Sequence, residues 1–333
     1  MSVLKEFGPL GFGWRVLPVV AVICLPAAAQ TVVNVPPEPA PQVVVSNTTI
    51  NLFDGGVIPG LRIGASDGSV NEVELNILGG AIETELEVLA GARVNIDSGV
   101  VRQRGSGGLQ VFGGEVNFTG GVITGQLQVG HFDGGVFHYR GGLIGQDTEL
   151  RGGSFNVYGG EFLLDGQPVE EFEDAIQFDI PDGSALSGTL ADGTPFAFST
   201  FLTPFSEQIS PGVLTLHRAP VPEPGPSVID VPAAAAPPGL RAGQTLNVHP
   251  GGMIDDIFTA NPGSTVNING GSVGDLFEAV GATVNISDGA VGGAFSAVSE
   301  SIVNVSGGSL GNLNLASESR ASVTGGIIGA IDV

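Results

Sequence analysis

Five side chains between positions 131 and 158 have the types and spacing that acid–base chemistry requires. Together they offer imidazole, carboxylate, guanidinium and phenol groups, which act as general acids, general bases and binders of acidic sugars. They are His131, Asp133, Arg140, Arg151 and Tyr158. If consecutive repeats stack, Asp133 and Arg151 lie on adjacent strands, where an exposed ion pair contributes at most about 1 kcal/mol. We favour this structural interpretation and keep a carbohydrate-active site at these residues as the alternative.

Most other kinds of site lack the side chains they need. The only Cys, the only Trp and the only Lys of the chain all precede position 30, which excludes a thiol nucleophile or a Schiff base from the rest. Residues 270–275 have the letters of a calcium-binding Gly-Gly-x-Gly-x-Asp repeat, but the second Gly spacing is one residue too long. We therefore expect no cofactor and no specific metal site, with only weak, non-specific binding of divalent cations.

The charge balance restricts the class of partner. The chain has 34 acidic and 11 basic side chains, giving a formal net charge of -23. Binding to nucleic acid depends on clustered Lys and Arg, so we exclude nucleic acid as a partner.

One polar position recurs eleven times, each time between two apolar residues and before a Gly turn, at spacings of 18 to 25 residues within each of two blocks. A period near 20 with one fixed side chain indicates a solenoid. Asn stacked at one position forms side-chain amide ladders, so we interpret the column as structural. Nine of the eleven residues are Asn51, Asn76, Asn95, Asn117, Asn156, Asn247, Asn267, Asn285 and Asn304, and the other two are His138 and Ser322.

The elements that must position these side chains are short strands. Residues 115–119 read Glu-Val-Asn-Phe-Thr between two Gly pairs, and this alternation predicts a strand with Val116 and Phe118 on the buried face. Phe137 and Phe155 occupy the equivalent place in the following repeats. We therefore predict an all-β parallel β-helix, with three-sided coils of roughly 18–22 residues in two stacks.

Changes in composition divide the chain into six segments. The first has a positive region, an apolar run and a small-residue cleavage site, which are typical of a secretory signal. The irregular fourth segment resembles a small antiparallel β module, and the fifth is rich in Pro. The predicted segments are a signal peptide at 1–29, an extended segment at 30–46, a first solenoid block at 47–164, the β module at 165–218, a Pro-rich linker at 219–238 and a second, apparently uncapped solenoid block at 239–333.

Two motifs resemble known extracellular proteins. The phrase Val-Asn-Ile-Asn-Gly-Gly-Ser-Val-Gly at 266–274, with a variant at 303–311, resembles the coils of large secreted bacterial β-solenoid proteins of the adhesin and autotransporter-passenger types. Residues 182–216 resemble modules found between such repeats in extracellular planctomycete-type proteins. The resemblance implies a repeat architecture on the outside of a cell, and its motifs are architectural rather than catalytic.

We therefore expect a secreted or cell-surface structural or adhesive protein without catalytic activity. Its partner would be an extracellular polysaccharide or another surface protein. The alternative is a polysaccharide lyase or hydrolase with its site on the first block. Because the last coil, which contains Asn304 and Ser322, has no polar or helical cap, we also expect end-to-end self-association through its exposed strand edges.

Overall fold

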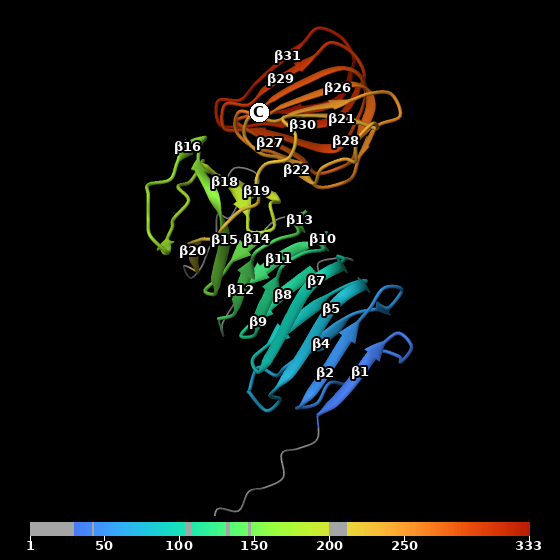
Figure 1. The fold of residues 1–333 in the computed structure, drawn as a ribbon, viewed down its shortest axis with the longest axis vertical. Helices are drawn as coiled ribbons and strands as arrows, with labels where there is room; N and C mark the ends of the chain where they lie inside the picture. Colours follow the sequence, from blue (N-terminus) through green and yellow to red (C-terminus); the bar gives the residue numbers. More distant parts are fainter. Residues whose placement is uncertain (1–29, 42, 104–107, 131–133, 146–147, 200–211) are drawn as a thin grey trace, which may run out of the picture.

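The computed structural model describes residues 30–41, 43–103, 108–130, 134–145, 148–199 and 212–333, and this part of the chain is all-β, with strands joined by short turns. The strands form two parallel β-solenoid stacks, as the sequence predicted (Figure 1). The expected signal peptide at 1–29 lies outside the described residues.

Each coil has three short sides separated by corners. One coil of the first stack contains β9 (Glu115–Phe118), β10 (Val122–Ile123) and β11 (Gln126–Val129). The alternation places Val116 and Phe118 inward, and both side chains are fully buried. The inward face was therefore predicted correctly, and the polar residue between them points outward on the first side of the coil.

The corners depend on Gly because successive coils approach closely there. Gly289 has a φ of 96°, in the left-handed region, and a Cβ at this position would lie 2.2 Å from the carbonyl oxygen of Gly271 in the preceding coil. Neither the backbone conformation nor the space permits a larger residue. The repeated Gly residues are therefore required by the coil-to-coil spacing.

The first stack extends from β1 to β20, and its strands pair in parallel across consecutive coils. The first side carries the repeated polar position and consists of β1 (Thr31–Val35), β2 (Thr48–Leu52), β5 (Val73–Ile82), β7 (Ala92–Val101), β9, β12 (Val136–Tyr139), β15 (Ser154–Leu164) and β20 (Val213–Arg218). The second side consists of β3 (Val57–Ile58), β10, β13 (Leu143–Ile144) and the ends of β5 and β7. The third side consists of β4 (Leu61–Ile63), β6 (Leu86–Leu89), β8 (Gly108–Phe112), β11 and β14 (Thr148–Leu150).

The second stack has the same three sides, and β26, β28, β30 and β32 each continue around a corner without interruption. Its first side consists of β21 (Val228–Val231), β23 (Thr245–Val248), β26 (Thr265–Val273), β28 (Thr283–Val298), β29 (Ile302–Val305) and β31 (Arg320–Val323). The other sides consist of β22 (Gly239–Leu240), β24 (Met253–Ile254), β25 (Phe258–Ala260), β27 (Phe277–Val280), β30 (Ser309–Leu315), β32 (Ile327–Asp332) and the later parts of β26 and β28.

Aromatic side chains form columns in both cores. Phe137 stacks on Phe155 with ring centroids 5.2 Å apart, and both rings are buried. In the second stack Phe277 lies between Phe258 and Phe295, at centroid distances of 5.5 and 4.4 Å. Equivalent positions in successive coils thus fill the core with the same side chain, because the coil repeat sets one inward direction for each position.

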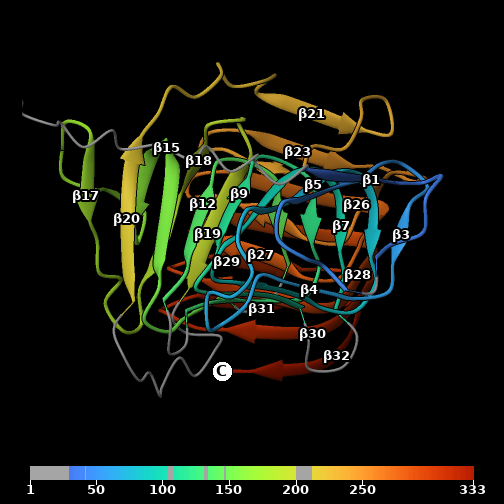
Figure 2. The same ribbon diagram turned by 90° about the horizontal axis from the view of Figure 1, so that it is seen from below.

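The expected β module is partly antiparallel and partly a continuation of the first stack. It contains β16 (Gln167–Pro168), β17 (Ala175–Gln177), β18 (Ala185–Leu190) and β19 (Pro195–Ser199). The hairpin of β18 and β19 is antiparallel and pairs with the later part of β15. β20 pairs antiparallel with β17 of the module and also lies parallel to β15, so residues 213–218 belong both to the module and to the first side of the first stack (Figure 2).

Two further boundaries are placed by the structure. The segment 30–46 was expected to be an extended entry strand before the first block; β1 is that strand, and it already belongs to the stack, in parallel register with β2. Likewise, residues 228–231 of the expected Pro-rich linker form β21, the first strand of the second stack. Both strands are followed directly by Pro, and neither has the Gly that later coils place three or four residues after the repeated polar position, which hid the repeat.

Candidate functional site

The first stack carries a continuous ladder of Asn amides on its first side. The Nδ2 group of Asn51 donates to Oδ1 of Asn34 at 2.9 Å, and Asn76 donates to Asn51 at 3.0 Å. The pattern continues with Asn95 on Asn76 at 2.8 Å and Asn117 on Asn95 at 3.0 Å. Every amide donates toward the N-terminal end of the stack, so the side-chain dipoles are aligned.

The second stack repeats this ladder with a carboxylate at its N-terminal end. Asn304, Asn285 and Asn267 each donate to the preceding Asn at 2.8 to 2.9 Å. Asn247 then donates at 2.9 Å to Oδ1 of Asp230. Hydrogen bonds from His249 and Asn247 hold the pKa of Asp230 below its usual range. The Asp230 carboxylate, which only accepts hydrogen bonds, therefore ends the row of donating Asn amides. The predicted Asn residues lie in register on neighbouring strands in both stacks.

In the first stack the ladder changes character at His138, which is in register with Asn117 on one side and Asn156 on the other. The His138 Nδ1 atom lies 3.0 Å from the hydroxyl of Tyr158. His217, on β20, stacks on the Tyr158 ring with centroids 4.3 Å apart. Its Nε2 atom lies 3.1 Å from Oδ1 of Asn156. An aromatic and imidazole cluster thus replaces the amide ladder near this end.

A cation covers the other face of the tyrosine. The guanidinium carbon of Arg140 lies 3.4 Å from the ring centroid of Tyr158, a cation–π contact worth about 0.5–1 kcal/mol at an exposed site. With His217 on one face, Arg140 on the other and His138 at the hydroxyl, Tyr158 has partners on all sides. We call Arg140, His138, Tyr158 and His217 the tyrosine cluster.

The electrostatics of the tyrosine cluster favour neutral imidazoles. Burial lowers the pKa of His138, although the Glu115 carboxylate, 3.7 Å from its Nε2 atom, acts in the opposite direction. Burial and the charge of Arg140 lower the pKa of His217 as well. Neutral imidazole is the form that accepts a proton, so the cluster contains two groups suited to a general base. A phenol lies between them.

Two of the five residues predicted as an alternative site come together in this cluster, namely Arg140 and Tyr158. Arg151 lies elsewhere and pairs with Glu149 at 2.8 Å, two positions away on the same edge of the coil. His131 and Asp133 lie outside the described residues. Of the three members that the structure describes, only Arg140 and Tyr158 are in contact.

Sequence reasoning missed His217 and understated His138. His138 was assigned only as a ladder position, whereas it is bonded to Tyr158. His217 lies in residues 213–218, whose alternating pattern of apolar and polar residues was attributed to an antiparallel module. The available signal was that alternation itself, since Leu214 and Leu216 match the inward positions of β15.

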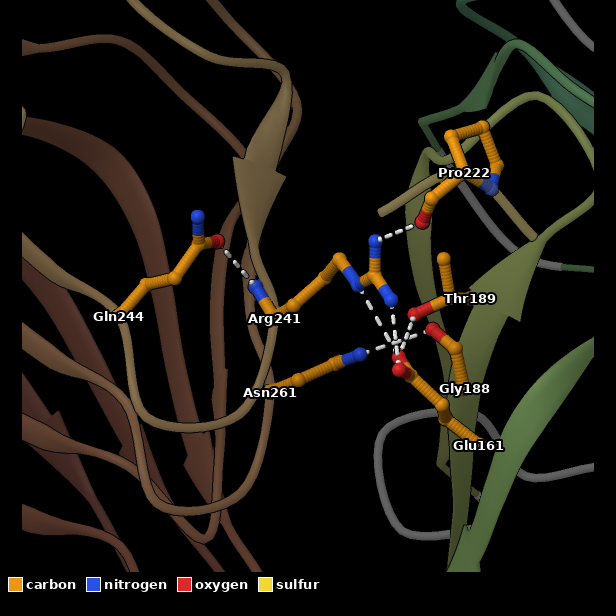
Figure 3. Close-up of polar contacts among 7 residues, drawn as sticks. All are labelled: Glu161, Gly188, Thr189, Pro222, Arg241, Gln244 and Asn261. Carbon is orange, nitrogen blue, oxygen red and sulfur yellow. Dashed lines mark hydrogen bonds and ion pairs between the residues drawn. The ribbon is translucent and has the colours of Figure 1, made fainter. Parts of the chain in front are cut away.

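A second polar centre joins the two stacks (Figure 3). Arg241 of the second stack, only 7% exposed, donates from Nε and Nη2 to the two carboxylate oxygens of Glu161, at 3.0 and 2.5 Å. Its Nη1 atom donates to the carbonyl of Pro222 at 2.7 Å, and Thr189 donates to Glu161 at 2.7 Å. Burial of Glu161 opposes ionisation, but the bonds from Arg241 and Thr189 bring its pKa below the usual value.

Further contacts surround this ion pair. Asn261 of the second stack donates to the carbonyl of Gly188 on β18 at 2.8 Å. Ala185, also on β18, packs in a fully buried cluster with Val280 and Val298 of the second stack. The hairpin of β18 and β19 therefore covers the end of the first stack and, at the same time, the side of the second, which joins the stacks into one body.

The described residues offer little for other kinds of site. Within them, no three His, Cys, Asp or Glu side chains come close enough together to hold a metal ion. The same part of the chain contains no helix with the length and apolarity that a membrane crossing requires. No protein-family model, curated protein or solved structure matches the chain.

Proposed function

We propose that the protein is a secreted or cell-surface structural protein that adheres through its outward strand faces and has no catalytic activity. The supporting observation is that two regular stacks are joined by a buried Arg241 and present the same outward positions coil after coil. A rigid body with repeated faces suits binding to an extended, repetitive partner. The signal-like N-terminus and the resemblance to secreted solenoid proteins support an extracellular location.

The third side of the first stack is the face that we propose for adhesion. Glu87, Gln110 and Gln128 lie in register on successive coils, with Arg62 before them and Glu149 after them. Their spacing is that of paired strands, about 4.8 Å, which is close to the length of one sugar unit in an extended polysaccharide. Donor and acceptor groups repeated at this spacing favour an extracellular polysaccharide lying along the stack.

Binding of the purified protein to immobilised acidic and neutral polysaccharides tests this proposal. The variant with Gln110→Ala and Gln128→Ala removes two amides from the third side and should lower the bound amount severalfold. A matched control, Glu83→Ala with Arg102→Ala, removes an exposed ion pair of 3.4 Å from the second side of the same stack and should bind normally. Absence of binding to every polysaccharide and to intact cell surfaces would contradict an adhesive role.

A carbohydrate-active enzyme is the second candidate, because Arg140, Tyr158 and two imidazoles converge in the tyrosine cluster. Against it, the faces and the hydroxyl of Tyr158 are already occupied by protein groups, which suits a structural role. Release of new reducing or unsaturated sugar ends by the wild-type protein, lost in Tyr158→Phe, would establish the enzyme. Equal inactivity of both proteins on polysaccharides that the wild type binds would favour the structural role.

A further inference from the structure

A cavity of about 590 Å³ lies where the two stacks and the β module meet. Phe155 of the first stack, Phe178 of the module and Phe198 of β19 line one part of it. The opposite wall is the third side of the second stack, where Glu278 is in register with Thr259 and Ser296. The volume is in the range of small-molecule sites, which are mostly apolar with a few polar groups.

Glu278 is the unusual member of this wall. Burial alone raises the pKa of its carboxyl to about 7, and no hydrogen bond or charged group among the described residues acts on it. By contrast, the Glu161 carboxylate pairs with Arg241 and the Glu87 carboxylate pairs with Arg62. A partly buried carboxylate without a partner is costly, and a bound cation would offset that cost.

The remaining lining groups define the charge of the cavity. Asp179, exposed at its rim, is the only other charged residue among the described lining residues, which include no Lys, Arg or His. Thr259, Ser296 and the aromatic wall do not titrate near neutral pH. The cavity therefore combines negative charge with aromatic surfaces, both of which attract organic cations.

We propose that this cavity binds a small organic cation with an apolar body, whose charged group pairs with Glu278 and whose body packs against Phe178 and Phe198. A metal ion is a poorer match, because two carboxylates among apolar walls do not supply the six or more oxygen ligands of a hard cation. The cavity shares Thr148 and Leu150 of β14 with the third side of the first stack. Glu278 belongs to the second stack and not to the row of Glu87, Gln110 and Gln128, so the proposal does not depend on the adhesive function.

Calorimetric titration of the purified protein with benzyltrimethylammonium tests the proposal, because the charge of this probe does not change with pH. Benzyl alcohol is the uncharged aromatic control and should bind at least about tenfold more weakly. Because the Glu278 carboxyl has a pKa of about 7, affinity for the cation should rise about tenfold between about pH 6 and about pH 8.

Variants identify the responsible group. Glu278→Gln keeps the shape of the side chain and should weaken cation binding about tenfold at about pH 8, without the pH dependence. Asp332→Asn removes a carboxylate from the same column, outside the cavity, and should leave binding unchanged; its position follows from its register with Asn314. Circular dichroism confirms that both variants are folded.

No binding of the cation to the wild type, equal binding of benzyl alcohol, or unchanged cation binding by Glu278→Gln would each overturn the proposal. An equal loss in Asp332→Asn and Glu278→Gln would also do so, because it would attribute the affinity to the general negative charge of the protein rather than to the cavity.

Discussion

The direction of the Asn ladders predicts that exchanging an amide for a carboxylate has opposite consequences at different places. Asn267 donates from Nδ2 to Asn247 at 2.9 Å and accepts from Asn285 at 2.8 Å. In Asn267→Asp the acceptor remains but the donor is lost, so two oxygens face each other. Asp230, at the end of the same ladder, only accepts. Asp230→Asn therefore keeps every bond that the ladder uses there.

The expected magnitude follows from the lost bond and the unpaired acceptor. A hydrogen bond contributes about 1 kcal/mol, and an acceptor left unsatisfied in a part-buried place costs about 1 kcal/mol or more. We therefore expect Asn267→Asp to lower the free energy of unfolding by about 2 kcal/mol at neutral pH. Asp230→Asn should change it by less than about 0.5 kcal/mol.

The pH dependence distinguishes this cause from general misfolding. The introduced carboxyl in Asn267→Asp can donate to Asn247 only when protonated, so its pKa is raised in the folded protein. Its penalty is therefore complete above the folded pKa and disappears below the unfolded value of about 3.9. Urea unfolding of both variants at about pH 5 and about pH 8 measures this difference. Equal losses in the two variants, or a loss in Asn267→Asp that does not depend on pH, would refute the ladder direction.

Three other predictions concern the core, the junction cavity and the last coil. Phe137 is fully buried against Phe155, so Phe137→Ala should cost about 3–5 kcal/mol in urea unfolding; a loss under about 1 kcal/mol would contradict the aromatic column. The folded-state pKa of Glu278 is raised from 4.5 to about 7, so ionisation of its carboxyl destabilises the fold as pH rises through that interval. Glu278→Gln should therefore raise the free energy of unfolding by up to about 3 kcal/mol above pH 7 and change it little below about pH 4.5. Among the described residues, β31 and β32 each pair along one edge only, and Ile327 and Ile331 are exposed there. Light scattering should therefore detect end-to-end association when salt screens the negative charge; an identical monomeric state in the wild type and in a variant with Pro and charged residues within 321–333 would contradict it.

The sequence predicted the coils well because the inward and outward directions repeat with every coil. Asn51 to Asn156 in the first stack and Asn247 to Asn304 in the second each lie in one column, because every member has apolar neighbours and a Gly corner nearby. Asn34 and Asp230 belong to the same columns, but Pro follows their strands instead of Gly. The neighbouring apolar residues, Val33 and Val35 beside Asn34 and Ile229 and Val231 beside Asp230, keep the alternation. This alternation was therefore the better indicator of a coil than the Gly turn.

The junction could not be predicted in the same way. Arg241 and Glu161 are 80 positions apart, and no repeat or motif relates them. Glu278 is one outward residue among many in the sequence, and only the packing of the β module against the second stack places it in an apolar cavity. Contacts between stacks depend on how the ends of the stacks meet, which a local periodicity does not encode.

The distance between one spin label on each stack tests most directly whether the two stacks form one rigid body. Cys24 is the only Cys of the chain. In a Cys24→Ser background, Val57→Cys and Met253→Cys, at positions that are 53% and 68% exposed, can therefore be labelled selectively. Pulsed electron spin resonance should give one narrow distance distribution, which Arg241→Ala broadens by removing the bonds to Glu161 and Pro222. A broad distribution in the protein with Arg241 intact would contradict a rigid junction, and with it the proposed scaffold.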